Sequence, residues 1–73
     1  MSYGEQAVGL AFNPSGDPQV KRIKELYAEI IDICNDNRLP SGILPERERL
    51  WSIAIKEAQG AQMWAVKAAT WRD

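Results

Sequence analysis

Histidine is absent from this chain of 73 residues, and cysteine occurs only once, at Cys34. Without histidine the common zinc sites cannot form, and the side chain most often used for general acid and base catalysis is missing. A single cysteine excludes an intrachain disulfide. Because a chain this short buries only a marginal core, we expect another source of stability, and association between copies is the one that remains.

Long apolar runs are also lacking. No stretch of about 18 apolar residues could span a membrane, and no basic segment followed by an apolar one has the form of a secretory signal. We therefore expect a soluble intracellular protein that meets no membrane. Nine Lys and Arg stand against ten Asp and Glu, a balance that argues against binding DNA or RNA. A small anionic ligand needs only a few local cations and amides, so it is still permitted.

Catalytic motifs are missing as well. The chain has no Gly-x-Ser-x-Gly turn, no phosphate-binding loop and no cluster of metal ligands. Cys34 falls on an apolar helical stripe, where an inert core thiol is expected. These absences predict a protein that is not an enzyme and that holds no metal and no cofactor.

The first long helix is expected over residues 18–37. Asp17 followed by Pro18 is a typical helix start, because the carboxylate caps free amides and proline suits the first helical position. Apolar residues then recur at spacings of three and four, the pattern of a packed helix. They are Val20, Ile23, Tyr27, Ile30, Ile31 and Cys34.

The second long helix is expected over residues 45–72. Residues 38–44 contain proline and glycine and predict a turn, which is short enough to fold the second helix back antiparallel. Residues 1–17 hold a short N-terminal arm or helix, followed by a Phe-Asn-Pro-Ser-Gly loop. The expected fold is thus all-α, an antiparallel two-helix hairpin in a single domain over residues 1–73.

The second helix is apolar on two faces. One face carries Leu50, Ala54, Ala61, Trp64, Ala65, Ala68 and Trp71, and the other carries Trp51, Ile55, Ala58, Met63, Val66 and Ala69. A helix of this kind needs two partners, and only one can come from the same short chain. The sequence therefore predicts a homo-oligomer, with small residues around Gly60 allowing close approach.

An antiparallel hairpin brings the start of the first helix beside the end of the second. Phe12 offers a ring to a purine, and Asn13 and Ser15 offer polar groups and free amides to a phosphate. The cations and hydroxyl expected nearby are Lys21, Arg22, Lys24, Lys67 and Thr70. This corner is a candidate site for an anionic ligand.

A simpler interpretation of the same residues stays open. The loop can be only a capped turn, and its basic neighbours only a solvated helix face. Trp64 and Trp71 are seven residues apart on one helical stripe, where core packing is the simpler role. Lys67 would then lie over an indole as a cation–π contact.

Two stretches carry a resemblance to a known family. They are VGLAFNPSGDPQVKRIK over residues 8–24 and GAQMWAVKAATW over residues 60–71. They resemble the phage anti-defence hairpin family that includes anti-CBASS protein 2 and Thoeris anti-defence protein 1. The carboxy-terminal motif is the more specific, and the hairpin layout extends the likeness over nearly the whole chain.

The resemblance implies a sponge that acts without catalysis in the cytoplasm of an infected bacterial host. Members form oligomers, typically hexamers, and sequester the cyclic nucleotides made by CBASS or Thoeris immune systems. Their ligands include cyclic dinucleotides such as 3′,3′-cGAMP, cyclic trinucleotides and cyclic ADP-ribose isomers. The implied partners are one such ligand and further copies of the chain.

The resemblance also implies roles for particular residues. Phe12 would stack on a base, and Asn13, Ser15 and Lys24 would contact phosphate. Weaker candidates for ligand contacts are Arg22, Lys67 and Thr70. The alternative from another class is a structural or regulatory helical hairpin that binds only protein partners.

Overall fold

The computed structural model describes residues 1–38 and 44–72. Over these residues the chain forms helices and no strand, so the all-α prediction is confirmed. In chain order the three helices are α1 (Tyr3–Val8), α2 (Pro18–Arg38) and α3 (Pro45–Ala69). Most of the predicted turn over 38–44 lies outside the described residues.

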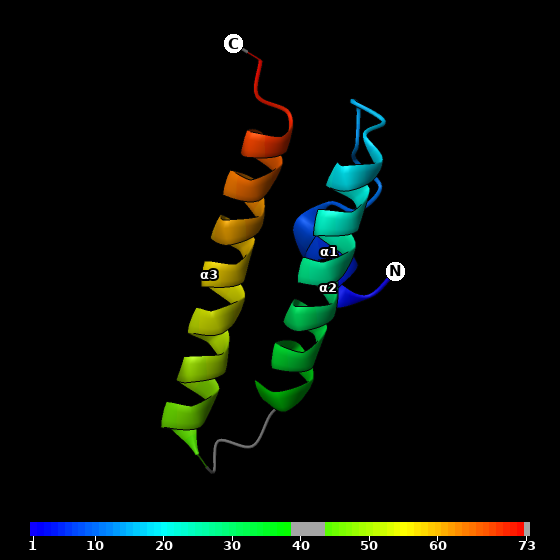
Figure 1. Ribbon diagram of the computed structural model, residues 1–73. Helices are drawn as coiled ribbons and strands as arrows, with labels where there is room; N and C mark the ends of the chain where they lie inside the picture. The colour runs from blue at the N-terminus through cyan, green and yellow to red at the C-terminus, as the bar shows by residue number, and fades with distance from the viewer. Residues whose placement is uncertain (39–43, 73) are drawn as a thin grey trace.

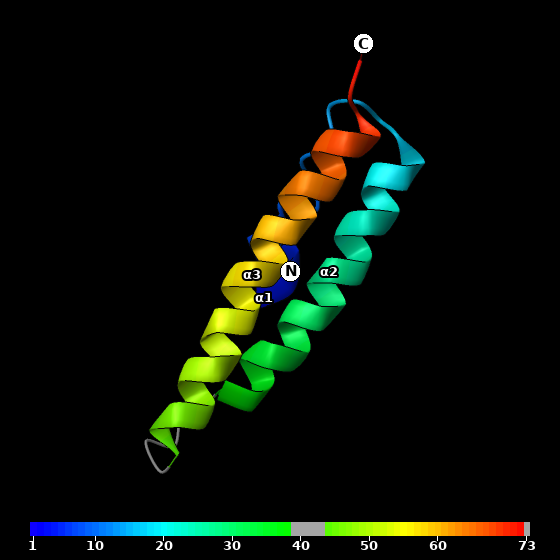
Figure 2. The same cartoon turned by 60° about the vertical axis from the view of Figure 1, so that its left-hand side comes forward.

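The two long helices, α2 and α3, run antiparallel and side by side, and α1 packs mainly against α2 (Figures 1 and 2). The molecule measures 48 × 25 × 13 Å along its principal axes. Its thinnest dimension is close to the diameter of one helix, about 10–12 Å. The hairpin is therefore a single layer, and no other described residue covers the broad outer faces of the two long helices.

The N-terminal segment is a helix rather than an extended arm. Ser2 caps α1 by accepting a hydrogen bond from the Glu5 amide at 3.1 Å, and the Glu5 carboxylate accepts one from the Ser2 amide at 2.7 Å. This reciprocal pair is a capping box, and its Ser-x-x-Glu spacing is readable in the sequence. The helix ends at Gly9, which takes the left-handed conformation with φ of 62°.

Gly4 sets how closely α1 approaches α2. A Cβ added at this position would lie 2.1 Å from the carbonyl oxygen of Ala28, a backbone atom that cannot move aside easily. The Gly4 amide donates a hydrogen bond of 2.7 Å to the carboxylate of Asp32. Glycine is therefore required here by close backbone contact.

The core lies where the three helices meet. Its buried apolar cluster consists of Val8, Ala28, Ile31, Cys34 and Ile55. The burial of Cys34 agrees with its predicted place in the core. The predicted stripe on the first helix was wrong in part, because Ile30 is 49% exposed whereas Lys24 is buried among the positions that face α1 and α3.

The ends of the long helices differ slightly from the prediction. α2 continues to Arg38. α3 ends at Ala69, before the predicted end at 72, with Thr70 as its C-cap. The Thr70 hydroxyl donates to the carbonyl oxygen of Val66 at 2.8 Å. The Thr70 amide donates to the same oxygen at 3.0 Å, so the hydroxyl and the amide of Thr70 both bond to the last turn of the helix.

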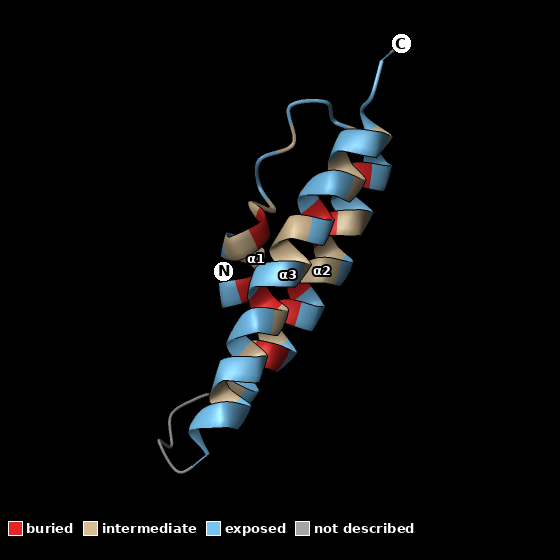
Figure 3. Ribbon diagram, turned by 90° about the vertical axis from the view of Figure 1, so that its left-hand side faces the viewer, coloured by how far each residue is buried: buried red, intermediate tan, exposed pale blue. Residues whose placement is uncertain are grey.

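Among residues 1–38 and 44–72, one of the two apolar faces of α3 is buried, through Ile55 and its neighbours. The outward face is exposed in Figure 3, and Trp64 on it is 70% exposed. The large apolar residues exposed on the two long helices are Leu26, Ile30, Ile33, Leu50, Ile53, Met63 and Trp64. Exposed apolar surface of this extent is typical of an interaction face.

Candidate functional site

The loop between α1 and α2 lies at the same end of the molecule as the carboxyl end of α3 (Figure 1). The antiparallel arrangement predicted this juxtaposition, and the structure has it. A surface recess of about 240 Å³ opens there, and we refer to it as the loop recess. It is lined by Phe12, Asn13, Pro14, Ser15, Val20, Lys24, Val66 and Thr70.

Lys24 is the buried cation of the loop recess, and it holds the backbone around it. Its side chain is buried, with 5% of the residue exposed. The ammonium donates to the carbonyl oxygen of Gly9 at 3.0 Å and to that of Phe12. An ammonium carries three N–H donors, so one is left without an acceptor among the described residues. The sequence marked Lys24 as a ligand cation, and the structure shows that it also fastens the backbone that carries Phe12.

Phe12 stands at the mouth of the loop recess. It is 73% exposed, and the Lys24 ammonium lies 5.7 Å from the centre of its ring. The Phe12 amide donates to the Gly9 carbonyl oxygen at 2.9 Å, which closes the turn that follows α1. The chain thus presents an aromatic face next to a positive charge, an arrangement that suits a base attached to a phosphate.

Asn13 and Ser15 bond to their own loop. The Ser15 hydroxyl donates to the Asn13 side-chain oxygen at 2.7 Å, and it accepts from the Asp17 amide at 3.2 Å. The Asn13 amide group donates to the Asp17 carbonyl oxygen at 3.1 Å. Asp17 in turn caps α2, as predicted, by accepting from the Gln19 amide at 2.8 Å. The simpler interpretation, a capped turn, therefore describes this hydrogen bonding well.

Lys67 and Thr70 come from the end of α3. The Lys67 ammonium lies 5.3 Å from the ring centre of Trp64 and 5.8 Å from that of Trp71. The predicted cation–π contact of Lys67 with an indole is thus confirmed, and it is made to both tryptophans. Thr70 lines the loop recess. Both tryptophans are mainly exposed within this chain, so core packing is not their role in a single copy.

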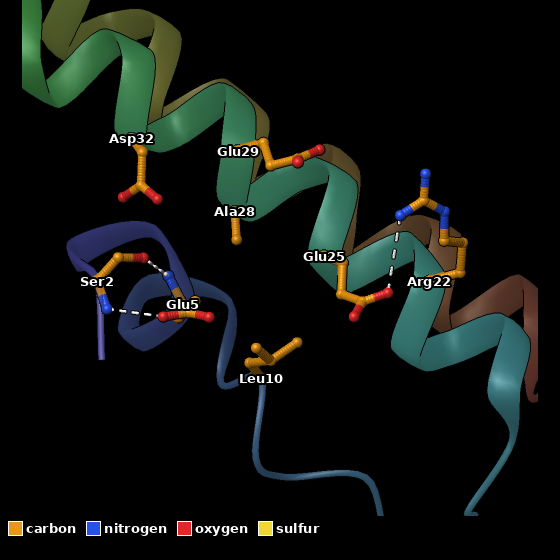
Figure 4. A pocket seen from close by; sticks show the side chains of 8 residues that line it. All are labelled: Ser2, Glu5, Leu10, Arg22, Glu25, Ala28, Glu29 and Asp32. Atoms are coloured by element: carbon orange, nitrogen blue, oxygen red, sulfur yellow. Dashed lines mark hydrogen bonds and ion pairs between the residues drawn. The ribbon is translucent and has the colours of Figure 1, made fainter.

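Arg22 lies apart from the loop recess. It lines a groove between α1 and α2, where its guanidinium is 3.8 Å from the Glu25 carboxylate (Figure 4). The same groove holds four carboxylates, those of Glu5, Glu25, Glu29 and Asp32. Phosphate would be repelled by this charge. The structure thus brings together six of the seven predicted site residues at the open end of the hairpin, where α2 begins and α3 ends. Arg22 is the residue that it leaves out.

A second recess, which we call the glutamine recess, adjoins the first. It has a volume of about 530 Å³ and lies between the end of α1 and the middle of α3. It shares Lys24 and Val66 with the loop recess. Its full lining is Gln6, Ala7, Val8, Gly9, Lys24, Gln59, Gln62, Met63, Val66 and Lys67.

The sequence interpretation missed the glutamines. Gln62 lies one and two helical turns from the apolar residues Ile55, Ala58 and Val66, so the helical period places it on the buried face. A polar residue at such a position is a signal that could have been read from the sequence. In the structure Gln62 is buried, as this period predicts.

Other chemistry finds little support in the described part of the chain. Residues 1–38 and 44–72 contain no group of three or more His, Cys, Asp and Glu side chains placed to hold a metal ion. None of the described helices has the length and apolar character needed to cross a membrane.

Comparison with known protein families gives a match over nearly the whole chain. The family model described as "Acb2/Tad1, hairpin domain" matches residues 4–70, which include the whole candidate site and all but the first residue of α1. No curated protein and no solved structure matches the chain.

Proposed function

The chain belongs to the Acb2/Tad1 hairpin family, and from this premise we propose a specific anti-defence function. The protein binds cyclic oligonucleotide second messengers, in the first place cyclic dinucleotides such as 3′,3′-cGAMP, and releases them unchanged. It acts in the cytoplasm of an infected bacterium and blocks CBASS or Thoeris signalling by capture alone. Cyclic trinucleotides and cyclic ADP-ribose isomers are further ligands to test.

The observation that carries the proposal is the pairing of Lys24 with Phe12. A buried ammonium keeps one donor for a ligand, and an exposed ring stands beside it. Stacking of one base contributes about 1–3 kcal/mol, and each hydrogen bond to a charged group about 1.5–3 kcal/mol. A few such contacts to a dinucleotide reach the roughly −12 kcal/mol of nanomolar binding after the costs of association.

In this proposal each of the remaining residues has a defined place. A phosphate takes the free donor of Lys24, and a base covers Phe12. Asn13 and Ser15 exchange their bonds within the loop for bonds to the same phosphate. Lys67 and Thr70 line the rim from α3, and because Arg22 lines the acidic groove we assign it no contact.

The second part of the proposal is a homo-oligomer, a hexamer as in the family. It is supported by the apolar residues that a single layer of helices leaves exposed, among them Ile33 and Trp64. Burial of each large apolar side chain contributes about 1.5–3 kcal/mol, which a chain of this size needs. A second copy placed over the loop recess would also exclude water from the ligand.

The third part is the absence of turnover. The chain contains no histidine, and its carboxylates near α1 gather in the groove with Arg22, away from Lys24 and Phe12. Among the described residues no carboxylate lines the loop recess, so we assign no base that would activate water for attack on a phosphodiester there.

Calorimetry tests the proposal against the alternative. The protein is titrated with 3′,3′-cGAMP, other cyclic dinucleotides, a cyclic trinucleotide and cyclic ADP-ribose isomers. GMP, a nucleotide that is not cyclic, serves as the control. We expect binding of at least one cyclic dinucleotide. Heat from none of them would favour a hairpin that binds only proteins. The bound sample is then heated and the ligand chromatographed, and a linear product would contradict capture without cleavage.

A further inference from the structure

Helix α1 is held on α2 by polar contacts at its start, away from the loop recess. The Asp32 carboxylate accepts a hydrogen bond of 2.7 Å from the Gly4 amide, and it points toward the first turn of α1 in Figure 4. The Arg38 guanidinium donates to the Tyr3 hydroxyl at 3.1 Å and lies 5.3 Å from the centre of the Tyr3 ring. Two residues of α2 thus bind the same turn of α1.

Arg38 is itself fixed by both long helices. Its Nε donates to the Asn35 side-chain oxygen at 3.0 Å, and a second nitrogen donates to the Ser52 hydroxyl at 3.3 Å. The planar guanidinium is therefore oriented before it meets Tyr3. Through Arg38 the start of α1 is tied to α2 and to α3.

α1 depends on such contacts because it is short. It has six residues, whereas isolated helices of fewer than about 12 residues are marginal in water. Segments with few packing contacts are also the first to unfold locally. Loss of the bonds from Asp32 and Arg38 should therefore shift α1 toward a state in which it has left α2.

The end of α1 passes directly into the segment that carries Phe12. The Gly9 amide donates to the Gln6 carbonyl oxygen at 3.1 Å. The Leu10 amide donates to the Glu5 carbonyl oxygen at 3.0 Å, which completes a Schellman-type helix end. The Phe12 amide then donates to the Gly9 carbonyl oxygen at 2.9 Å. Because these bonds join Phe12 to the helix, its position follows the position of α1.

We propose that Asp32 and Arg38 are positioning residues for the ligand site. Neither lines the loop recess, and along α2 they lie about 12 Å and about 21 Å from Lys24. By seating α1 they set where Phe12 stands relative to Lys24. This inference rests on the proposed function, because that function assigns the base to Phe12 and the phosphate to Lys24.

The charge of Asp32 alone predicts the opposite effect. A carboxylate repels an anionic ligand, so its removal should strengthen binding if Asp32 acts only through its charge. A positioning role predicts weaker binding, since a site that is formed for only part of the time has an apparent affinity reduced by that fraction. The direction of the change therefore separates the two roles.

The test measures the affinity for 3′,3′-cGAMP by calorimetry. We expect Asp32→Ala to bind at least threefold more weakly than the wild type. Asp32→Asn should recover the affinity, because its amide oxygen can still accept from Gly4. Tyr3→Phe keeps the ring and the net charge but loses the bond from Arg38, and it should also weaken binding. Glu29→Ala removes an exposed carboxylate of the same groove and, as the matched control, should not weaken it.

Hydrogen exchange gives a second readout, in the protein without ligand. One hydrogen bond to a charged group changes an equilibrium roughly tenfold or more. The bonded amides of residues 6–10 should therefore exchange about tenfold faster in Asp32→Ala than in the wild type. Coupling between sites is reciprocal, so 3′,3′-cGAMP should slow the exchange of these amides in the wild type. Circular dichroism verifies that each variant folds.

The outcomes distinguish the inference from its premise. A wild type that binds no cyclic nucleotide overturns the proposed function and this inference with it. If the wild type binds and Asp32→Ala binds as tightly or more tightly, the positioning role alone is overturned, and an Asp32→Asn protein as weak as Asp32→Ala overturns it too. Wild-type affinity in Tyr3→Phe would overturn the role of Arg38. Weaker binding by Asp32→Ala and Tyr3→Phe, with recovery in Asp32→Asn, supports the inference.

Discussion

Replacing Lys24 by methionine should weaken both the fold and the ligand site. Lys24→Met keeps the buried aliphatic stem and removes the ammonium. The carbonyl oxygen of Gly9 retains the bond from the Phe12 amide, whereas that of Phe12 loses the donor it has among the described residues. Backbone hydrogen bonds such as that from the Phe12 amide to Gly9 then remain to hold the turn that presents the aromatic ring.

The magnitude follows from these bonds. Two hydrogen bonds from a charged donor contribute about 1.5–3 kcal/mol each, and the relief of burying an ammonium offsets part of the loss. We expect a net decrease of about 2 kcal/mol in the free energy of unfolding. For a domain of this length, the melting temperature should fall by roughly 8–16 °C.

The assay is thermal unfolding followed by circular dichroism, at one protein concentration throughout because association would also stabilise the fold. Calorimetry with 3′,3′-cGAMP should show at least a tenfold loss of affinity. Lys21→Met, at an exposed position of the same helix, is the matched control and should change little. A Lys24→Met protein that melts and binds like the wild type would refute the reasoning.

Three further predictions concern other parts of the chain. Gly4→Ala should destabilise the fold by about 1–3 kcal/mol, because its Cβ would overlap a backbone carbonyl of α2; a melting temperature equal to that of the wild type would contradict this contact. Phe12→Ala should lower dinucleotide affinity roughly tenfold through lost stacking, with the native mass of the oligomer unchanged; equal affinity would place the base elsewhere. Hydrogen bonds from Arg49 lower the pKa of Glu46 below 4.5, so this pair supports the start of α3 above that pH and its contribution is lost as the pH falls through the lowered value. Arg49→Ala should raise the pKa of Glu46 in an NMR titration, and an unmoved pKa would contradict the pairing.

The sequence predicts the two long helices well, for local reasons. Asp17 and Pro18 mark the start of α2 through capping chemistry that depends on neighbouring residues alone. The segment between the two long helices is short, so the second helix is predicted to fold back antiparallel. This arrangement brings Phe12 close to Thr70. The capping box at Ser2 also depends on neighbouring residues alone. The glycines among the first eleven residues nevertheless leave both an arm and a short helix open in the prediction.

Features that depend on contacts distant in the chain were harder to predict. The sequence marks Lys24 as a ligand cation or as part of a solvated helix face, whereas in the structure the carbonyl groups of Gly9 and Phe12, which follow α1, accept its hydrogen bonds and make it a buried fastening for the loop. Arg22 differs from it by two positions, about 200° around the helix, and so faces the acidic groove.

Native mass spectrometry with 3′,3′-cGAMP tests the central claim most directly, since it reports the number of copies and the mass of the bound ligand in one spectrum. We expect an oligomer of the 8.2 kDa chain that carries intact cyclic dinucleotide. A single 8.2 kDa chain with no ligand bound, or an oligomer that carries a hydrolysed product, would contradict it.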